Sequence, residues 1–136
     1  MTTRIDRRNP DTLHGTPGYH HVTVVEAGRM AYLAGQCPVG LDGQVVEGDV
    51  LAQVDQVAVN IGHALAAAGA GPGDVVRSVI YVASSDRDTL GAVWTRLRAS
   101  AVADAFTTAS TLLGIAGLGF PGQLVEVDLT VALPEA

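Results

Sequence analysis

The chain has 136 residues, of which 48% are hydrophobic and 16% charged, and its formal net charge is −6 at pH 7. This composition supports a packed core, and the negative charge argues against a broad nucleic-acid-binding face. All eight cationic side chains are arginines, which excludes Schiff-base catalysis by lysine. A single cysteine excludes an internal disulfide. No signal peptide or membrane span is recognisable, and we expect a cytoplasmic protein with no membrane partner.

The first 18 residues carry arginines, prolines and glycines without hydrophobic periodicity. We expect them to form a partly extended N-terminal arm whose arginines are solvated. A two-residue alternation begins after His20 and resumes at Met30, with a turn at Ala27–Gly28 between the two segments. This pattern predicts a hairpin made of strands near 22–25 and 30–34. No linker or internal repeat divides the chain, so we expect residues 1–136 to form a single domain.

A helix is predicted over residues 50–68, because an apolar stripe follows a potential N-cap at Asp49 and ends before Gly69. The β-branched run over 75–83 predicts a central strand. Ser84, Ser85 or Asp86 is expected to cap a second helix, whose apolar stripe is formed by Leu90, Val93, Leu97 and Ala101.

Two more strands are expected, over 107–116 and over 125–133, and the last one alternates strictly between apolar and polar residues. These elements predict an α+β fold in which about five or six strands form a single sheet and two helices pack on one face. Two helices cover only one face of such a sheet, so the other face meets water or another chain. The low charged fraction favours a homo-oligomer that buries this face.

Glu126 and Asp128 are predicted to share that helix-free face, with their side chains about 7 Å apart. Two carboxylates in this arrangement can act as acid and base, but the pattern taken alone favours a polar row that faces solvent or an interface and completes the alternation. Cys37 is interpreted as an apolar thiol rather than a nucleophile. The histidines show no metal-ligand spacing, and we expect no metal site.

Several short motifs then occur in order between residues 9 and 132. They comprise Asn9-Pro10, Gly18-Tyr19-His20-His21, Leu33-Ala34-Gly35-Gln36-Cys37-Pro38, Gly48-Asp49-Val50, and Leu124-Val125-Glu126-Val127-Asp128. In this ordered spacing the chain resembles the RidA/YjgF family, also known as L-PSP endoribonuclease. The resemblance implies a chorismate-mutase-like fold, which is an α+β fold with a single mixed β-sheet and two helices packed on one face. It also implies a homotrimer, three ligand sites at subunit interfaces, and hydrolysis of imines or enamines without a metal or cofactor.

The resemblance also implies roles for individual residues. Glu126 matches the glutamate that positions water and is the expected catalytic residue. Substrate binding is implied for Tyr19, Gly35, Ala34, Trp94, Ala109 and Ser110. At position 109 the family has an arginine that binds the substrate carboxylate, so Ala109 removes this carboxylate clamp and the chain resembles a subgroup without it.

We therefore expect a homotrimer that binds a small neutral or apolar imine, enamine or carbonyl compound at its subunit interfaces. Whether it also hydrolyses this ligand is left open; if it is an enzyme, we expect a cofactor-independent hydrolase of the imine or enamine deaminase type. A non-catalytic small-molecule-binding or regulatory protein is the alternative. An endoribonuclease or translation inhibitor is disfavoured by the acidic charge and the few aromatic residues, and we expect no nucleic-acid partner.

Overall fold

A computed structural model describes residues 4–135. Its main sheet has four strands in the order β3-β6-β4-β5, formed by Met30–Tyr32 (β3), Val125–Ala132 (β6), Val75–Val82 (β4) and Ala109–Gly114 (β5). β6 runs antiparallel to both of its neighbours, whereas β4 and β5 are parallel. The sheet is therefore mixed, as the family resemblance implies, but it has four strands where the sequence pattern predicts about five or six.

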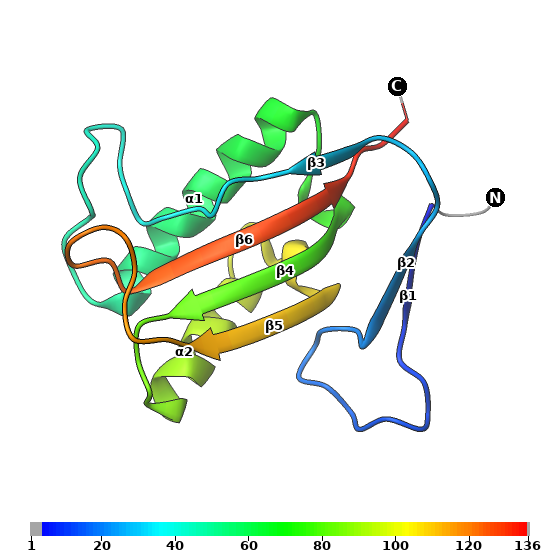
Figure 1. Ribbon diagram of the computed structural model, residues 1–136, viewed down its shortest axis with the longest axis horizontal. Coiled ribbons are helices and arrows are strands. Elements are labelled where there is room, and N and C mark those ends of the chain that lie inside the picture. The colour runs from blue at the N-terminus through cyan, green and yellow to red at the C-terminus, as the bar shows by residue number, and fades with distance from the viewer. Residues whose placement is uncertain (1–3, 136) are drawn as a thin grey trace.

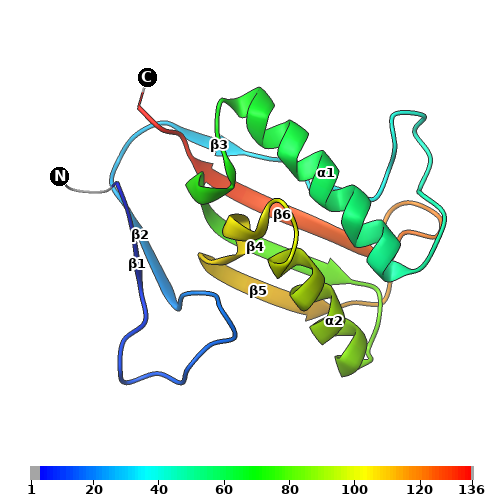
Figure 2. The ribbon, with the colours of Figure 1, turned by 180° about the vertical axis from the view of Figure 1, so that it is seen from behind.

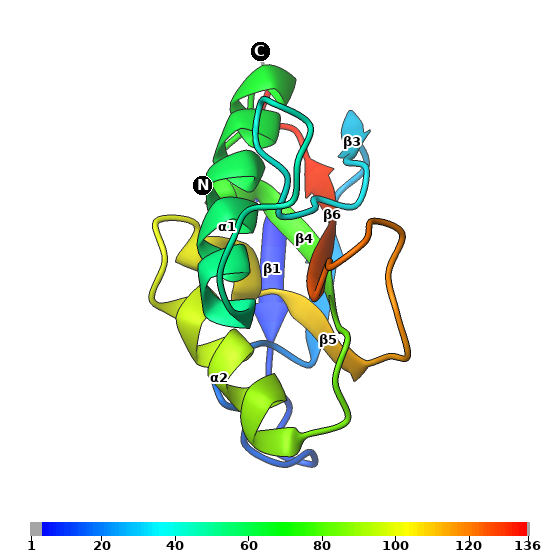
Figure 3. The same ribbon diagram turned by 90° about the vertical axis from the view of Figure 1, so that its left-hand side faces the viewer.

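Two α-helices, α1 (Val50–Ala68) and α2 (Arg87–Arg98), cover the same face of this sheet. Figure 1 shows the sheet in front of the helices, and Figure 2 shows the same layers from behind. Seen from the side, the helices lie on one side of the sheet and the loop between β5 and β6 on the other (Figure 3). The predicted α+β fold, with one face free of helices, is confirmed.

The alternation of apolar and polar residues along β6 explains why one face of the sheet packs against the helices and the other does not. Val125, Val127, Leu129 and Val131 point toward the helices and are buried, while Glu126, Asp128 and Thr130 lie on the opposite face. The buried side chains pack against Val54, Val57, Ile61 and Leu65 of α1 and against Val93 and Leu97 of α2. Burial of this apolar surface is the main contribution to stability.

Both helices begin directly after a residue that the sequence analysis predicts as a possible N-cap. The Asp49 side chain accepts a hydrogen bond from the Ala52 amide at 2.9 Å, and α1 ends at Gly69, whose φ of 78° lies in the left-handed region. Asp86 is the cap of α2. The predicted stripe of α2 is wrong at Ala101, which is exposed beyond the end of the helix.

The N-terminal region differs from the sequence prediction in its strand pairing. Ile5–Arg8 (β1) is a strand that pairs antiparallel with Val22–Val25 (β2), whereas the predicted partner of β2 pairs with β6 instead. β1 and β2 form a separate two-stranded sheet beyond one end of the main sheet (Figure 1). The prediction of a β2–β3 hairpin in one continuous sheet is therefore wrong.

The expectation of solvated arginines in the arm is wrong for Arg4 and Arg7, whereas Arg8 is exposed. The Arg7 guanidinium donates to the carbonyl oxygens of Gly73 and Val75 at 3.0 and 2.8 Å, and Arg4 donates to the carbonyl oxygen of Arg29 at 3.0 Å. These side chains dock β1 by satisfying backbone acceptors at the ends of other elements. Residues 1–3 of the expected arm lie outside the described range.

None of the helices in the described part of the chain is both long enough and apolar enough to cross a membrane.

Candidate functional site

The carboxylate of Glu126 is held at the start of β6, on the helix-free face. Its Oε1 atom accepts two hydrogen bonds, from Cys37 Sγ and from Gln123 Nε2, each at 3.1 Å. Two donors on one oxygen fix the side-chain rotamer. They also leave Oε2 as the oxygen available to another group.

Gly35 provides the space for that second oxygen. The Gln36 amide donates to the Val127 carbonyl oxygen at 2.7 Å, and Val127 donates back at 3.0 Å, so this segment lies directly beside β6. A Cβ atom placed on Gly35 would lie 2.8 Å from Glu126 Cδ and closer still to Oε2. The carboxylate therefore packs against the Gly35 backbone, and a larger residue at 35 would displace it.

A cavity of about 590 Å³ opens beside these groups, and we call it the Glu126 cavity. The Asp128 side chain and the Tyr81 ring also line it, together with the loop that follows β5. Glu126 and Asp128, the two carboxylates paired in the sequence analysis, therefore line the same cavity. Its remaining lining residues are Leu33, Gly35, Ile115, Gly117 and Leu118.

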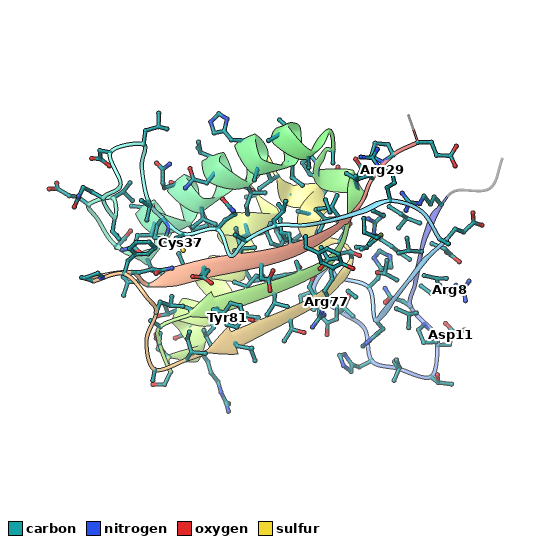
Figure 4. The ribbon with its side chains drawn as sticks, turned by 45° about the horizontal axis from the view of Figure 1, so that its top comes forward. Arg8, Asp11, Arg29, Cys37, Arg77 and Tyr81 are labelled. Atoms are coloured by element: carbon teal, nitrogen blue, oxygen red, sulfur yellow. The ribbon has the colours of Figure 1, made fainter. Side chains whose placement is uncertain are left out.

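The thiol beside Glu126 is a poor nucleophile. Desolvation by burial, together with the hydrogen bond to Glu126 and the negative charge of that carboxylate, raises the pKa of Cys37 to about 11. The thiol is therefore protonated at neutral pH and acts as a hydrogen-bond donor. Figure 4 places Cys37 close to the start of β6. The sequence interpretation of Cys37 did not include this contact.

Three other predicted site residues gather at a different place, between β5 and α2. Tyr19, Trp94 and Ser110 line a second cavity of about 390 Å³, which we call the Tyr19 cavity. The rings of Tyr19 and Trp94 meet edge to face with centroids 6.1 Å apart, and Trp94 Nε1 donates to the Pro17 carbonyl oxygen at 3.2 Å. Ser110 Oγ donates to the Thr108 carbonyl oxygen at 2.9 Å.

Ala109 and Ala34 belong to neither cavity. Ala109 is the first residue of β5, and its register partner on β4 is Arg77. Ala34 is exposed, and its carbonyl oxygen accepts a hydrogen bond from Gln36 Nε2 at 3.0 Å. A larger cavity, of about 740 Å³ between α1 and the 36–41 loop, contains none of the predicted site residues.

Position 109 and Glu126 are far apart within one copy of the chain. Glu126 pairs with Tyr81, and Tyr81 pairs with Leu113, which is four residues beyond Ala109 on β5. Two strand spacings and four residues of rise give a Cα separation of about 16 Å. A small ligand cannot span this distance, so one copy does not bring the whole set of expected residues together.

Sequence reasoning did not identify Gln123 or Tyr81 as part of the site. Gln123 precedes β6 in a loop, and nothing in its local pattern indicates that its side chain turns back to Glu126. Tyr81 lies on the same face as Glu126 because β4 and β6 are paired, a long-range relation that periodicity within one strand does not give. No group of three or more potential metal ligands occurs in the described range 4–135.

The fold and the sequence define a class of small α+β proteins with several solved relatives. A Rid-family protein of unknown function from Yersinia pestis, YyfB, is 31% identical and superposes with a TM-score of 0.86, with coverage of 96% of this chain and all of that one. Rv2704 from Mycobacterium tuberculosis, of the YjgF/YER057c/UK114 family, is 26% identical with a TM-score of 0.63, over 86% and 88% of the two chains.

The family model described as Endoribonuclease L-PSP matches residues 12–133. The chain therefore belongs to this family, which is the RidA/YjgF family. Protein DfrA from Myxococcus xanthus is 38% identical over 65 residues, which is 47% of this chain and 50% of that protein. The aligned part of the chain thus spans about half the length of this curated relative.

Proposed function

We propose that the chain forms a homo-oligomer that binds a small imine, enamine or carbonyl compound between copies and hydrolyses the imine form. The observation that carries this proposal is the state of the Glu126 carboxylate. One oxygen accepts hydrogen bonds from two protein donors, and the residue lines a cavity on a sheet face that no helix covers. Such a carboxylate is oriented to accept a proton from a water molecule.

The proposed chemistry balances without a cofactor. Glu126 Oε2 takes a proton from water as the water oxygen bonds to the imine carbon, and Glu126 passes that proton to the imine nitrogen, which gives a neutral carbinolamine. Glu126 then takes the hydroxyl proton of the carbinolamine as the C=O bond forms. The C–N bond breaks with its electron pair on nitrogen, and the same proton passes from Glu126 to the departing nitrogen. The products are a carbonyl compound and ammonia, and the carboxylate returns to its starting state.

Assembly is part of the proposal because position 109 and Glu126 lie too far apart in one copy of the chain to contact the same small ligand. A second copy that brings its position-109 region to the Glu126 cavity of the first would complete a site of ligand size. The RidA/YjgF resemblance implies a trimer, and the exposed Tyr32 and Leu113 on the helix-free face support burial of that face. A trimer of 14.0 kDa chains has a mass of about 42 kDa, which light scattering after size exclusion measures directly.

The test compares ammonia release from a panel of neutral and anionic imines by the parent protein and by Glu126→Gln. We expect Glu126→Gln to retain the assembly and its melting temperature while turnover falls at least 100-fold. Glu47→Gln, a similar loss of charge on an exposed loop residue, is the control and should change neither property.

A non-catalytic binding protein remains the second candidate, because a fixed carboxylate can also act only as a hydrogen-bond acceptor. It predicts thermal stabilisation by a ligand with no turnover of any imine. If Glu126→Gln lowers the melting temperature or dissociates the assembly, Glu126 is structural and the hydrolase proposal fails.

A further inference from the structure

Helix α1 carries two amide side chains, Gln53 and Asn60, that bind the loops around Glu126. The two residues are seven positions apart in the chain, which corresponds to two helical turns and about 10.5 Å along one side of the helix. Gln53 is only 3% exposed, although the other buried side chains of α1 are all apolar. A buried amide lowers stability unless its polar atoms find partners. The partners of these two amides therefore indicate why they are there.

The Gln53 amide binds the segment that carries Gln123. Its Nε2 atom donates to the Gly122 carbonyl oxygen at 2.9 Å, and its Oε1 atom accepts from the Leu124 amide at 2.7 Å. These two backbone groups flank Gln123 on either side, so the segment is fixed as it would be by a neighbouring strand. Gln123 is itself 4% exposed, and its Nε2 atom donates to Glu126. Gln53 thus holds the backbone from which one donor reaches the carboxylate.

The Asn60 amide holds the other donor in a similar way. Its Nδ2 atom donates to the carbonyl oxygens of Cys37 and Val39, each at 2.9 Å. Its Oδ1 atom accepts from Gln56 Nε2 at 2.9 Å, which fixes the orientation of the amide from one turn earlier in the helix. The backbone of Cys37 is therefore bound to α1, while its thiol donates to Glu126.

Both donors of the Glu126 carboxylate consequently depend on one helix. The start of α1, the loop before β6 and the chain that follows β3 lie at the same end of the sheet (Figure 1). From two different loops, the thiol of Cys37 and the amide of Gln123 reach the same oxygen, each at 3.1 Å. A shift of either loop by about 1 Å takes its donor beyond hydrogen-bond distance. The carboxylate keeps its orientation only while both loops keep their places.

We propose that Gln53 and Asn60 are positioning residues, which orient Glu126 through the loops of Gln123 and Cys37. The inference rests on the proposed function, because it assumes that the orientation of Glu126 matters for the chemical step. Neither amide side chain lines the Glu126 cavity. Loss of either amide should therefore lower kcat and leave KM nearly unchanged.

The competing explanation is that the two amides only stabilise the fold. Their loss would then lower the melting temperature without a specific effect on kcat, as the loss of any buried contact of α1 would. Val57→Ala supplies the matched comparison. Val57 lies between the two amides on the same helix, is fully buried and belongs to the apolar core.

The first experiment compares Gln53→Met, Asn60→Leu and Val57→Ala with the parent, using the imine that the parent hydrolyses fastest. Methionine and leucine keep approximately the size of the two amides and remove all of their hydrogen bonds. We expect kcat to fall at least tenfold in both amide variants, with KM within about twofold of the parent. Val57→Ala should lower the melting temperature and keep kcat within about twofold. Oligomeric mass is measured for each protein.

Double variants test the route through the loops. If Gln53 acts through Gln123, the kcat of Gln53→Met combined with Gln123→Met should equal that of Gln123→Met alone within about twofold. The same comparison applies to Asn60→Leu combined with Cys37→Ala. A further tenfold loss in either double variant would show that the amide acts by another route and would overturn the inference for that residue.

The thiol gives a measurement that needs no substrate. Glu126 is one of the groups that raise the pKa of Cys37 to about 11. If Asn60→Leu releases the Cys37 loop from Glu126, that pKa should fall toward the ordinary 9.0, whereas Val57→Ala should leave it unchanged. The pH dependence of the alkylation rate of the thiol reports this value. Asn60 is only half-buried, so this variant carries the test if Gln53→Met does not fold.

The outcomes separate this inference from the proposed function. Unchanged kcat in both amide variants, or an equal fall of kcat in Val57→Ala, rejects the positioning role and leaves the hydrolase proposal standing. An unchanged thiol pKa in Asn60→Leu shows that Asn60 does not hold Cys37 against Glu126. If the parent hydrolyses no imine, the proposed function fails and the kinetic part of the inference fails with it, while the thiol pKa still decides whether α1 orients this contact.

Discussion

Replacing Gly35 by alanine tests the contact on which the orientation of Glu126 depends. A methyl group at 35 would lie 2.8 Å from Glu126 Cδ and 3.1 Å from Cγ. Carbon atoms pack at about 3.5 Å or more, so the carboxyl group must retreat by about 0.7 Å. The Gly35 backbone is not in the left-handed region, and alanine is therefore compatible with its conformation.

A displacement of this size away from the donors breaks the hydrogen bond from Gln123 and stretches the one from Cys37. The donors Cys37 Sγ and Gln123 Nε2 lie at 3.1 Å, and a retreat of about 0.7 Å takes the nitrogen donor beyond hydrogen-bond distance, whereas the larger sulfur atom stays near its limit. A hydrogen bond to a charged carboxylate contributes about 2 kcal/mol, and the gain from replacing a flexible glycine offsets up to about 1 kcal/mol. The net loss of about 1 kcal/mol corresponds to a decrease in melting temperature of about 3–4 °C for a chain of this length.

The single cysteine reports the position of the carboxylate independently of any substrate. Because Glu126 helps to raise the pKa of Cys37 to about 11, moving the carboxylate away should lower that value toward the ordinary 9.0, while burial keeps it from falling all the way. The pKa is measured from the pH dependence of the alkylation rate of the thiol.

The control for this measurement is Gly71→Ala. Gly71 also has an ordinary backbone conformation, with φ of −122°, and a Cβ there meets nothing within 4 Å. It should leave both the melting temperature and the thiol pKa unchanged. If Gly35→Ala behaves like Gly71→Ala in both measurements, the carboxylate does not pack against Gly35 and the described geometry is wrong.

Two further predictions concern the same end of the sheet. Gly114→Ala should destabilise the folded protein far more than Gly35→Ala, by about 3 kcal/mol or more in chemical unfolding. The reason is that a Cβ atom at 114 would overlap the backbone carbonyl oxygen of Ser84, which cannot rotate away. A loss of stability below about 1 kcal/mol would contradict this close approach. The raised pKa of Cys37 means that the folded protein holds the thiol proton between about pH 9 and 11, where the unfolded chain releases it. Folding stability should therefore fall as the pH rises through this window, and this decrease should be smaller in Cys37→Ala; equal pH profiles for the two proteins would refute it.

Local sequence patterns predicted the elements whose stabilisation is local. Asp49 and Gly69 mark both ends of α1 because a cap and a left-handed residue act within one helical turn. The alternation in β6 gave the buried face correctly, since a strand of period two has only two possible orientations. Strand pairing was harder: β1 carries two adjacent arginines and no alternation, and its partner β2 was assigned to β3 because those two are close in sequence.

The site was predictable as a set of residues and not as an arrangement. The RidA/YjgF resemblance identified Glu126 and Gly35, which the structure places in contact, and Tyr19 and Trp94, whose rings meet edge to face. It could not indicate that these pairs lie in different cavities. Cavities depend on the three-dimensional packing of segments such as the loop after β5, whose glycine-rich sequence has no period to interpret.

The charges on the helix-free face connect assembly to ligand binding. Glu126 and Asp128 lie toward one end of this face, and Arg77 lies toward the other end beside Ala109. Contact between the acidic end of one copy and the basic end of the next would pair opposite charges and would also reduce the 16 Å separation to the size of a ligand. A closed ring of three copies and a twofold pair both satisfy this contact, with three and two sites respectively. The oligomer mass, about 42 kDa for a ring of three and about 28 kDa for a pair of 14.0 kDa chains, therefore identifies the symmetry, whereas the ratio of bound ligand to protein should be one per chain in either case. A lower ratio would mean that the two ends of the face do not meet.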